Sequence, residues 1–251
     1  MKISIIIPAH NEEGSIQKTV DQIHRTLDSA KIDYEIIIVN DHSIDRTGEL
    51  LSEMAAGDTR MKAVENRMPP GFGYAVRSGL EAYRGDAAVI VMGDHSDVPE
   101  DILAYHRKFQ EGYECVFGSR FMRGSKVINY PSHKLIINRI ANWFIRLLFG
   151  VSLNDTTNAF KGYKRNVIDG IQPLISPHFN LTVEMPLKAI IRGYSFAVIP
   201  IQWHGRISGI SKLKIKEMGG RYLFIVLYLW LEKMLSRGDY FRRDGDKAST
   251  T

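Results

Sequence analysis

The first half of the chain alternates short apolar runs with longer stretches in which apolar residues recur every three or four positions. The short runs predict buried strands at 3–8, 34–40, 61–65, 87–92 and 115–118. The longer stretches predict amphipathic helices, of which the first places these residues on one face: Ile16, Val20, Ile23 and Leu27. Because strands that alternate with helices build parallel sheets, this half is predicted to be an α/β domain.

The second half carries two strongly apolar helical segments. In residues 134–149 (KLIINRIANWFIRLLF), most polar residues recur at every fourth position, which leaves a wide apolar face. Residues 222–231 (YLFIVLYLWL) are ten apolar or aromatic residues between Arg221 and Lys233. As a helix this run is about 15 Å long, half of a bilayer's ~30 Å core, so it is too short to span. We expect both helices to lie at a membrane surface, or else to pack on the domain, a second copy or a partner subunit.

These patterns divide the chain into three predicted parts. Residues 1–212 form the main domain, residues 213–238 form C-terminal amphipathic helices, expected at a membrane interface, and residues 239–251 form a flexible tail.

Composition narrows the cellular setting and the possible partners. The chain has 251 residues and a formal net charge of +5, a mild excess that does not demand a nucleic-acid partner. The single cysteine, Cys115, excludes a disulfide framework and fits a reducing compartment. The apolar run in MKISIIIPAH is too short for a signal peptide. We therefore expect a peripheral protein on the cytoplasmic face of a membrane.

Carboxylates follow three of the predicted strands, in PAHNEE (8–13), NDHSIDRT (40–47) and GDHSD (93–97). Ligands of open parallel sheets bind at the carboxyl ends of the strands. Carboxylates there can accept hydrogen bonds from a base or a ribose and can bind a hard divalent cation. Each of them alone could also cap the helix that follows. The repetition at three strand ends favours a binding site.

Asp94 is the strongest metal candidate, as a ligand of Mg²⁺ or Mn²⁺ that bridges a diphosphate. Asp97 is either a second ligand or a cap for the helix predicted at Pro99. Binding of phosphate groups also requires positively charged side chains held in position. Five basic residues downstream are candidates for that role: Arg120, Lys134, Arg139, Arg206 and Lys212.

In this order and spacing, the motifs resemble family 2 glycosyltransferases of the GT-A fold, and within them the dolichol-phosphate mannose synthase-like, polyprenyl-phosphate glycosyltransferases. The resemblance covers most of residues 3–215. The segments that carry it are SIIIPAHNEE, IIIVNDHSIDRT, GFGYAVRSG, VIVMGDHSDVPED, FGSRF, YPSHK, DTTNAFKGYKR and HGRISGISKLK.

The resemblance implies a Rossmann-like, mostly parallel sheet and a role for each matching residue. Residues 1–212 would be the catalytic domain. Asp94 would hold the metal and the donor diphosphate, and Lys134 would face the lipid phosphate. Apart from the resemblance, the apolar helix at a membrane surface would also bring Arg139 to that phosphate. The phosphates would be neutralised by Arg120, Arg206 and Lys212, of which the last two would act in catalysis with Asp94. The nucleotide-sugar pocket would be lined by Pro8, His10, Glu12, Val39, Asp41, Gly93 and His95.

The sequence departs from the family pattern at three places. Met92 replaces the first aspartate of the metal motif, Ser96 replaces a glutamine that often assists the metal, and Asn158-Ala159-Phe160 replaces serine-glycine-phenylalanine. These changes leave the number of metal ligands and the identity of the sugar open.

The resemblance implies an inverting, metal-dependent transfer of a hexose from a nucleotide sugar to a dolichyl or undecaprenyl phosphate. It favours GDP-mannose, with UDP-glucose as the alternative. A lipid phosphate is anionic at neutral pH, so no strong general base is required. Glu184 is the one downstream carboxylate to consider, and a structural role suits it better. Two other functions remain open: transfer to a soluble or glycan acceptor, and a membrane-associated sugar-nucleotide binding module that has lost catalysis.

Overall fold

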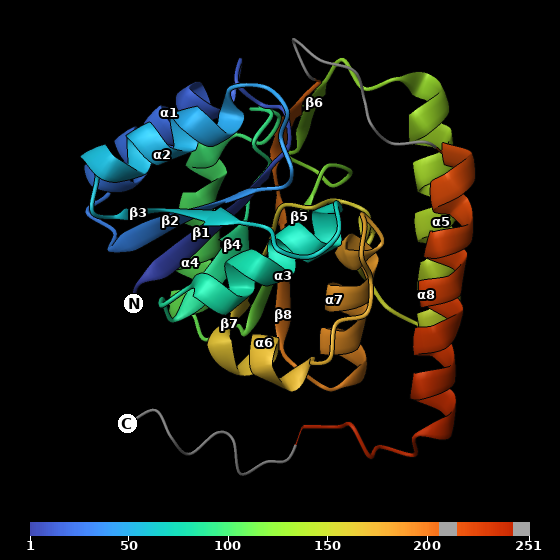
Figure 1. Ribbon diagram of the computed structural model, residues 1–251. Helices are drawn as coiled ribbons and strands as arrows, with labels where there is room; N and C mark the ends of the chain where they lie inside the picture. Colours follow the sequence, from blue (N-terminus) through green and yellow to red (C-terminus); the bar gives the residue numbers. More distant parts are fainter. Residues whose placement is uncertain (206–214, 243–251) are drawn as a thin grey trace.

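The computed structural model describes residues 1–205 and 215–242. A central sheet is covered by helices on both faces, and a further pair of helices forms an outer layer (Figure 1). The seven strands of the sheet are β1 (Ile3–Ala9), β2 (Tyr34–Asn40), β3 (Met61–Glu65), β4 (Ala87–Ile90), β5 (Cys115–Ser119), β7 (Lys161–Lys164) and β8 (Phe196–Pro200).

The strand order is β3-β2-β1-β4-β7-β5-β8, and all neighbouring pairs are parallel except those made by β7. The five strands predicted from apolar runs are confirmed within two residues at each end. The sequence pattern did not predict β7 (KGYK), because a four-residue strand with a lysine at each end lacks an apolar run. β7 runs antiparallel between β4 and β5 and joins the two halves of the chain in one sheet.

Side chains of β1 alternate between two apolar clusters, one on each face of the sheet. Ile5 and Ile7 pack on one face and Ile6 on the other. The first face is covered by α1 (Ile16–Ser29), α2 (Thr47–Gly57) and α4 (Ile102–Gln110), the last preceded by the short helix η1 (Pro99–Asp101). The second face is covered by α3 (Phe72–Ala82), α6 (Arg165–Gly170) and α7 (Leu181–Ile191).

A small two-stranded sheet supports the loop that follows β4. β6 (Lys126–Ile128) and β9 (Gln202–His204) pair in parallel. Trp203 also forms a bridge with Asp97, and the His204 amide donates to the Ser96 carbonyl at 2.9 Å. The Asp94 loop is thereby fixed to β9.

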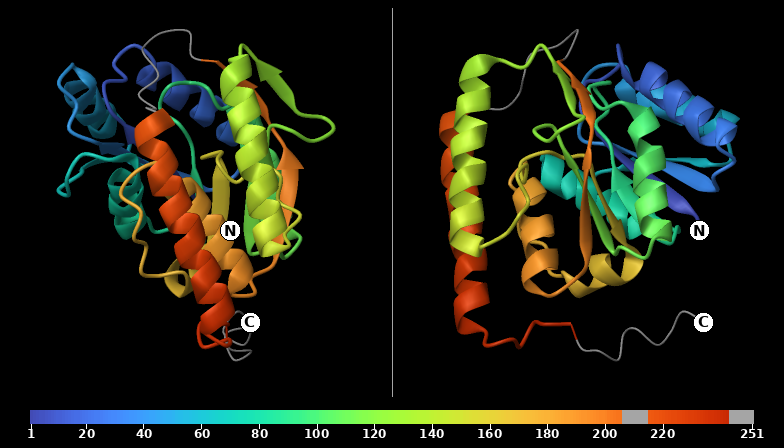
Figure 2. Two further views of the ribbon diagram at one scale, coloured as in Figure 1. Left: turned by 90° about the vertical axis from the view of Figure 1, so that its right-hand side faces the viewer. Right: turned by 180° about the vertical axis from the view of Figure 1, so that it is seen from behind.

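The outer layer consists of α5 (Ser132–Phe149) and α8 (Ile215–Leu235), which run side by side in the same direction (Figure 2). The two helices share an apolar cluster with α7, which lies between them and the sheet. α8 is longer than the predicted ten-residue run. One reason is that polar residues beyond the run are bound by the rest of the protein: Glu232 pairs with Arg192 at 3.0 Å, and Lys233 donates to the Phe149 carbonyl at 2.6 Å. Within the described residues, no helix is both long and apolar enough to cross a bilayer.

The chain after α8 returns to the domain built on the central sheet. Arg242 donates to both oxygens of Glu114 at 2.6 and 2.7 Å, and its amide donates to the Arg192 carbonyl at 3.0 Å. Residues 239–242, which we predicted to be part of a flexible tail, are thus docked on the domain. The remaining tail residues, 243–251, lie outside the described part of the chain.

Candidate active site

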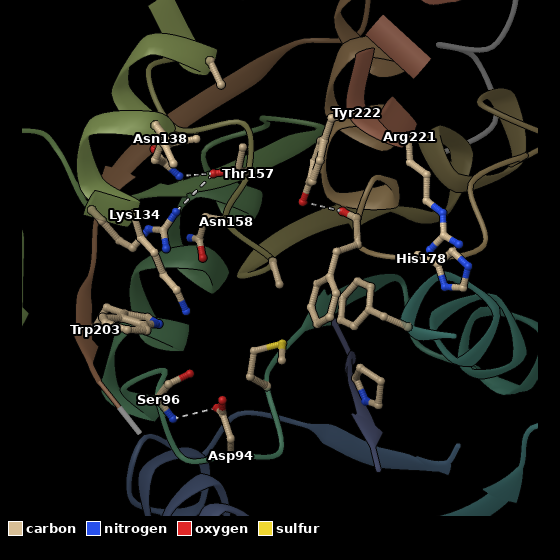
Figure 3. A pocket seen from close by; sticks show the side chains of 18 of the residues that line it. Asp94, Ser96, Lys134, Asn138, Thr157, Asn158, His178, Trp203, Arg221 and Tyr222 are labelled. Carbon is tan, nitrogen blue, oxygen red and sulfur yellow. Dashed lines mark hydrogen bonds between the residues drawn. The ribbon is translucent and has the colours of Figure 1, made fainter. Parts of the chain in front are cut away.

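A pocket of about 920 Å³ opens between the carboxyl edge of the sheet and the α5–α8 pair (Figure 3). Its floor carries the residues that follow β1, β2 and β4, and its roof carries residues of α5 and α8. Eight of the predicted site residues line it: Pro8, His10, Glu12, Asp41, Asp94, Asp97, Arg120 and Lys134.

The loops after β1 and β2 are held together by hydrogen bonds from backbone amides of the second loop to side chains of the first. Asn11 Oδ1 accepts from the Ile44 amide at 2.8 Å, and Glu13 accepts from the Arg46 amide at 3.0 Å. Asp45 accepts from the Thr47 amide at 3.0 Å just before α2, whose N-cap residue is Arg46 and has no side-chain cap. Glu13 and Asp45 therefore hold the two loops together and are not among the residues that line the pocket.

Asp41 lies where the two loops meet a third. Its carboxylate accepts from the Asn66 side chain at 2.7 Å and from the Gly71 amide at 3.0 Å, and its carbonyl contacts His10 Nδ1 at 2.6 Å. Val39, predicted to line this pocket, is instead fully buried in the core beside α3, because its position in β2 faces that helix.

The loop after β4 offers two carboxylates. Asp94 Oδ1 accepts from the Ser96 amide at 3.1 Å. Asp97 is buried; its Oδ2 accepts from the Met92 amide at 3.0 Å, and its Oδ1 has no partner among the described residues. Burial raises the pKa of Asp97 to about 7.

These residues fit a divalent cation that phosphate and water complete. Mg²⁺ usually takes one or two carboxylates, and the unpartnered oxygen of Asp97 is available for such a role. No set of three or more acidic, histidine or cysteine side chains in the described residues could enclose a metal without help. Gly93 and His95 are not among the lining residues; the Gly93 carbonyl accepts from Ser15 at 3.0 Å and supports the turn.

Arg120 is held by a bidentate ion pair with Asp155, with both N–O distances 2.8 Å. Both side chains are buried, so the guanidinium is already neutralised. Lys161 lies in the same buried cluster, donating to the carbonyls of Thr156 and Asn158, and burial lowers its pKa to about 7. Arg120 thus belongs to a rigid wall of the pocket.

Lys134 and Asn138 point into the pocket from α5, and Asn138 donates to Thr157 (Figure 3). Arg139 is not among the lining residues: its guanidinium lies 5.0 Å from the Phe121 ring centroid and donates to the Asn154 carbonyl at 3.4 Å. Arg206 and Lys212, expected to act in catalysis, lie outside the described residues.

The polar stripe of α5, which includes Asn138 and Asn142, faces the domain built on the central sheet. Asn142 is buried and accepts from the amide and the hydroxyl of Thr156 at 2.6 and 2.7 Å. The stripe therefore fixes the loop around residues 154–158. The opposite, apolar face of the helix is left exposed.

Several lining residues were not singled out from the sequence. Trp203 projects from β9, and Phe179 stacks on Phe72 with ring centroids 4.4 Å apart while its carbonyl accepts from Tyr222 at 3.2 Å. Besides Lys134 and Asn138 of α5 and Arg221 of α8, the roof is mostly apolar, with Ile137, Ala141, Phe144, Ile145, Tyr222, Leu223 and Val226. Their spacing is that of any buried helix face, so no sequence signal distinguishes a pocket wall from a core.

Glu184 has the structural role expected for it. It is fully buried, pairs with Lys188 at 2.9 Å and accepts from the amides of Ile175 and Ser176. It is not among the residues that line the pocket.

Comparison with known proteins agrees with this geometry. The chain is 29% identical over 215 residues to the polyprenol monophosphomannose synthase of Mycolicibacterium smegmatis, covering 83% of this chain and 80% of that protein. It is 29% identical over 222 residues to the dolichol-phosphate mannosyltransferase of Pyrococcus furiosus, covering 87% of this chain and 61% of that protein.

Among solved structures, the fold is similar to that of glucosyl-3-phosphoglycerate synthase from Mycobacterium tuberculosis in complex with UDP, with a TM-score of 0.65 at 20% identity over 97% of this chain and 82% of that one. The same enzyme has been solved with Mn²⁺, UDP and phosphoglyceric acid (TM-score 0.62, 19% identity, 97% and 80% of the chains). The GT-A fold expected from the sequence is confirmed. The model of the family "Glycosyl transferase family 2" matches residues 4–171, and the chain is a glycosyltransferase that belongs to this family.

Proposed function

We propose that this protein transfers a hexose, with mannose favoured, from a nucleoside diphosphate sugar to a polyprenyl phosphate, with inversion at the anomeric carbon. The observation that carries the proposal is the composition of the pocket. Carboxylates line its floor, apolar side chains of two amphipathic helices line its roof, and Lys134 lies between them. Such a pocket suits a substrate pair that is polar at one end and apolar at the other. Both named relatives are mannosyl transferring enzymes of polyprenol-type lipids, which supports the same assignment.

The donor nucleoside would bind between Pro8, His10 and Asp41. Guanine presents two N–H groups to a carboxylate, whereas uracil presents one, so an aspartate here favours GDP-mannose. A carboxylate has about four lone-pair sites, and Asp41 keeps some after accepting from Asn66 and Gly71. Competition by free GDP and UDP tests this assignment, with stronger inhibition by GDP expected.

The acceptor phosphate would bind near Lys134 and Asn138. One of its oxygens attacks the anomeric carbon and forms the new C–O bond, while the bond from that carbon to the donor diphosphate breaks and the nucleoside diphosphate leaves with the electron pair. The acceptor oxygen is already anionic, so no side chain needs to remove a proton. Lys134 would orient the acceptor and offset its charge.

Asp94, with Asp97 beside it, would hold Mg²⁺ or Mn²⁺ against the donor diphosphate. Such a cation supplies positive charge to the leaving group. We propose that Arg206 and Lys212 would also offset the negative charge of the leaving diphosphate.

The outer helices would bind the cytoplasmic surface of a membrane. They expose many large apolar side chains, which is costly for a protein without a partner. On α5 these are Ile136, Ile137, Ile140, Trp143, Phe144 and Leu147, and on α8 they are Leu223, Phe224, Leu227, Tyr228, Leu231, Met234 and Leu235. A second copy or a partner subunit is the alternative cover for this face. Flotation with vesicles that contain anionic lipid tests the proposal: protein that stays wholly at the bottom of the gradient contradicts it.

The function itself is tested by incubating the protein with Mn²⁺, polyprenyl phosphate and GDP-mannose or UDP-glucose labelled in the sugar. We expect label in the organic phase, with GDP-mannose as the better donor. Label transferred only to a soluble acceptor would support the first alternative function. Nucleotide binding with neither transfer nor hydrolysis would support the binding module.

A further inference from the structure

The indole of Trp203 forms part of the pocket wall, and the proposed function gives it no role. In Figure 3 its nitrogen-bearing edge points into the cavity, on the side where Lys134 reaches down from α5 and above the loop that carries Asp94 and Ser96. Trp203 therefore lies between the groups proposed for the acceptor phosphate and those proposed for the donor diphosphate.

The position of this side chain is fixed from several directions. Its backbone pairs with Val127 in β6 on one side and with Asp97 on the other. Its ring meets Tyr130 edge-on, with centroids 5.1 Å apart, and the Arg120 guanidinium lies 6.0 Å from the ring centroid. Because Asp155 holds Arg120 in turn, the indole is presented to the pocket with little freedom to move.

The indole also retains an unused donor. Its Nε1–H finds no hydrogen-bond acceptor in the described residues, and Tyr130 and Arg120 contact the ring rather than this group. An indole can only donate, so a ligand that satisfies it must bring an acceptor oxygen. The remainder of the ring is apolar and suits a surface of C–H groups.

The hexose of the donor offers both an acceptor oxygen and a surface of C–H groups. The transferred hexose has its anomeric carbon between the donor diphosphate and the acceptor phosphate, and it carries hydroxyl oxygens next to C–H faces. We propose that Trp203 binds the hexose, with Nε1–H donating to one sugar hydroxyl and the ring packing against the sugar. Trp203 is thus a specificity-determining residue for the sugar and not for the nucleotide. This inference rests on the proposed nucleotide-sugar donor.

Calorimetric titration of four proteins with GDP and with GDP-mannose tests it. The proteins are the wild type, Trp203→Phe, Trp203→Ala and the control Tyr113→Phe, which removes an exposed aromatic donor outside the pocket. We expect GDP to bind all four equally, which also shows that each variant is folded. Loss of one hydrogen bond should weaken GDP-mannose binding to Trp203→Phe roughly fivefold, with a larger loss for Trp203→Ala and none for Tyr113→Phe.

The inference is overturned if both Trp203 variants bind GDP-mannose as tightly as the wild type, or if they lose GDP and GDP-mannose affinity to the same extent. UDP and UDP-glucose replace the guanine ligands if the wild type prefers them, with the same expectations. A wild type that binds no member of either pair refutes the proposed donor and this inference with it. Binding that is unchanged by the Trp203 variants refutes the inference alone.

Discussion

Replacing Asp155 with asparagine should destabilise the protein strongly although Asp155 is not among the pocket-lining residues. Its carboxylate binds the Arg120 guanidinium through two 2.8 Å hydrogen bonds and also accepts from the Arg120 amide at 3.0 Å. Both side chains are buried. Asparagine keeps the shape but removes the charge, so a guanidinium that remains protonated is left buried without its counterion. Breaking a buried pair in this way costs about 3–5 kcal/mol.

The expected change is large enough to measure by urea unfolding and by thermal denaturation. For a chain of this size, about 2–4 °C of Tm corresponds to 1 kcal/mol, so Asp155→Asn should lower Tm by about 6–20 °C. The matched control is Glu111→Gln, which removes the exposed 2.6 Å pair with Lys108 and should cost less than about 1 kcal/mol. The double variant Arg120→Met/Asp155→Leu should recover much of the lost stability. The buried ion pair is refuted if Asp155→Asn lowers the unfolding free energy no more than Glu111→Gln does. It is also refuted if the stability changes caused by the substitutions at Arg120 and at Asp155 simply add in the double variant.

Three further predictions concern the metal, a buried lysine and the outer helices. Asp94→Ala should lower kcat on the order of 10²- to 10³-fold in the transfer assay; near-normal turnover at saturating Mn²⁺ would refute its role. Lys161 is neutral in the folded protein between its lowered pKa of about 7 and the ordinary 10.5, while the unfolded chain binds the proton. Unfolding free energy should therefore rise with pH across this window by about 5 kcal/mol more in the wild type than in Lys161→Met, and parallel pH profiles would contradict this. Leu147→Glu/Leu231→Glu should reduce vesicle flotation, whereas Ile44→Glu, at a position that is 91% exposed and far from the outer helices in the chain, should not; equal flotation of all three proteins would disprove membrane binding through this face.

The sequence predicted where the strands of the first half end, because a short continuous run of apolar residues rarely forms anything other than a buried strand. The ends of β1, β2 and β4 do lie at the pocket floor, where Asp41 and Asp94 are among the lining residues. Val39, Gly93 and His95 are not. Residues alternate along a strand, and resemblance to a motif does not state which of two neighbouring residues faces the site.

The roof could not be predicted in the same way. Apolar residues of α5 and α8 recur with the same helical periodicity whether they face a core, a pocket or a membrane. The hydrogen bonds between Asn142 and Thr156 depend on how two segments distant in the sequence pack together. The pairing of Arg120 with Asp155 is likewise a property of the fold. It changes the interpretation of Arg120 from an available phosphate ligand to a neutralised part of the wall.

The linkage formed in the product tests the central claim most directly. After transfer from the α-linked donor GDP-mannose to polyprenyl phosphate, the lipid product is purified and its anomeric configuration and phosphorus linkage are determined by ¹H and ³¹P NMR. The account predicts a β-linked mannose joined to the lipid through a phosphodiester, since the acceptor phosphate oxygen attacks opposite the leaving diphosphate. An α-linked product, or a sugar attached to anything other than the lipid phosphate, would contradict it.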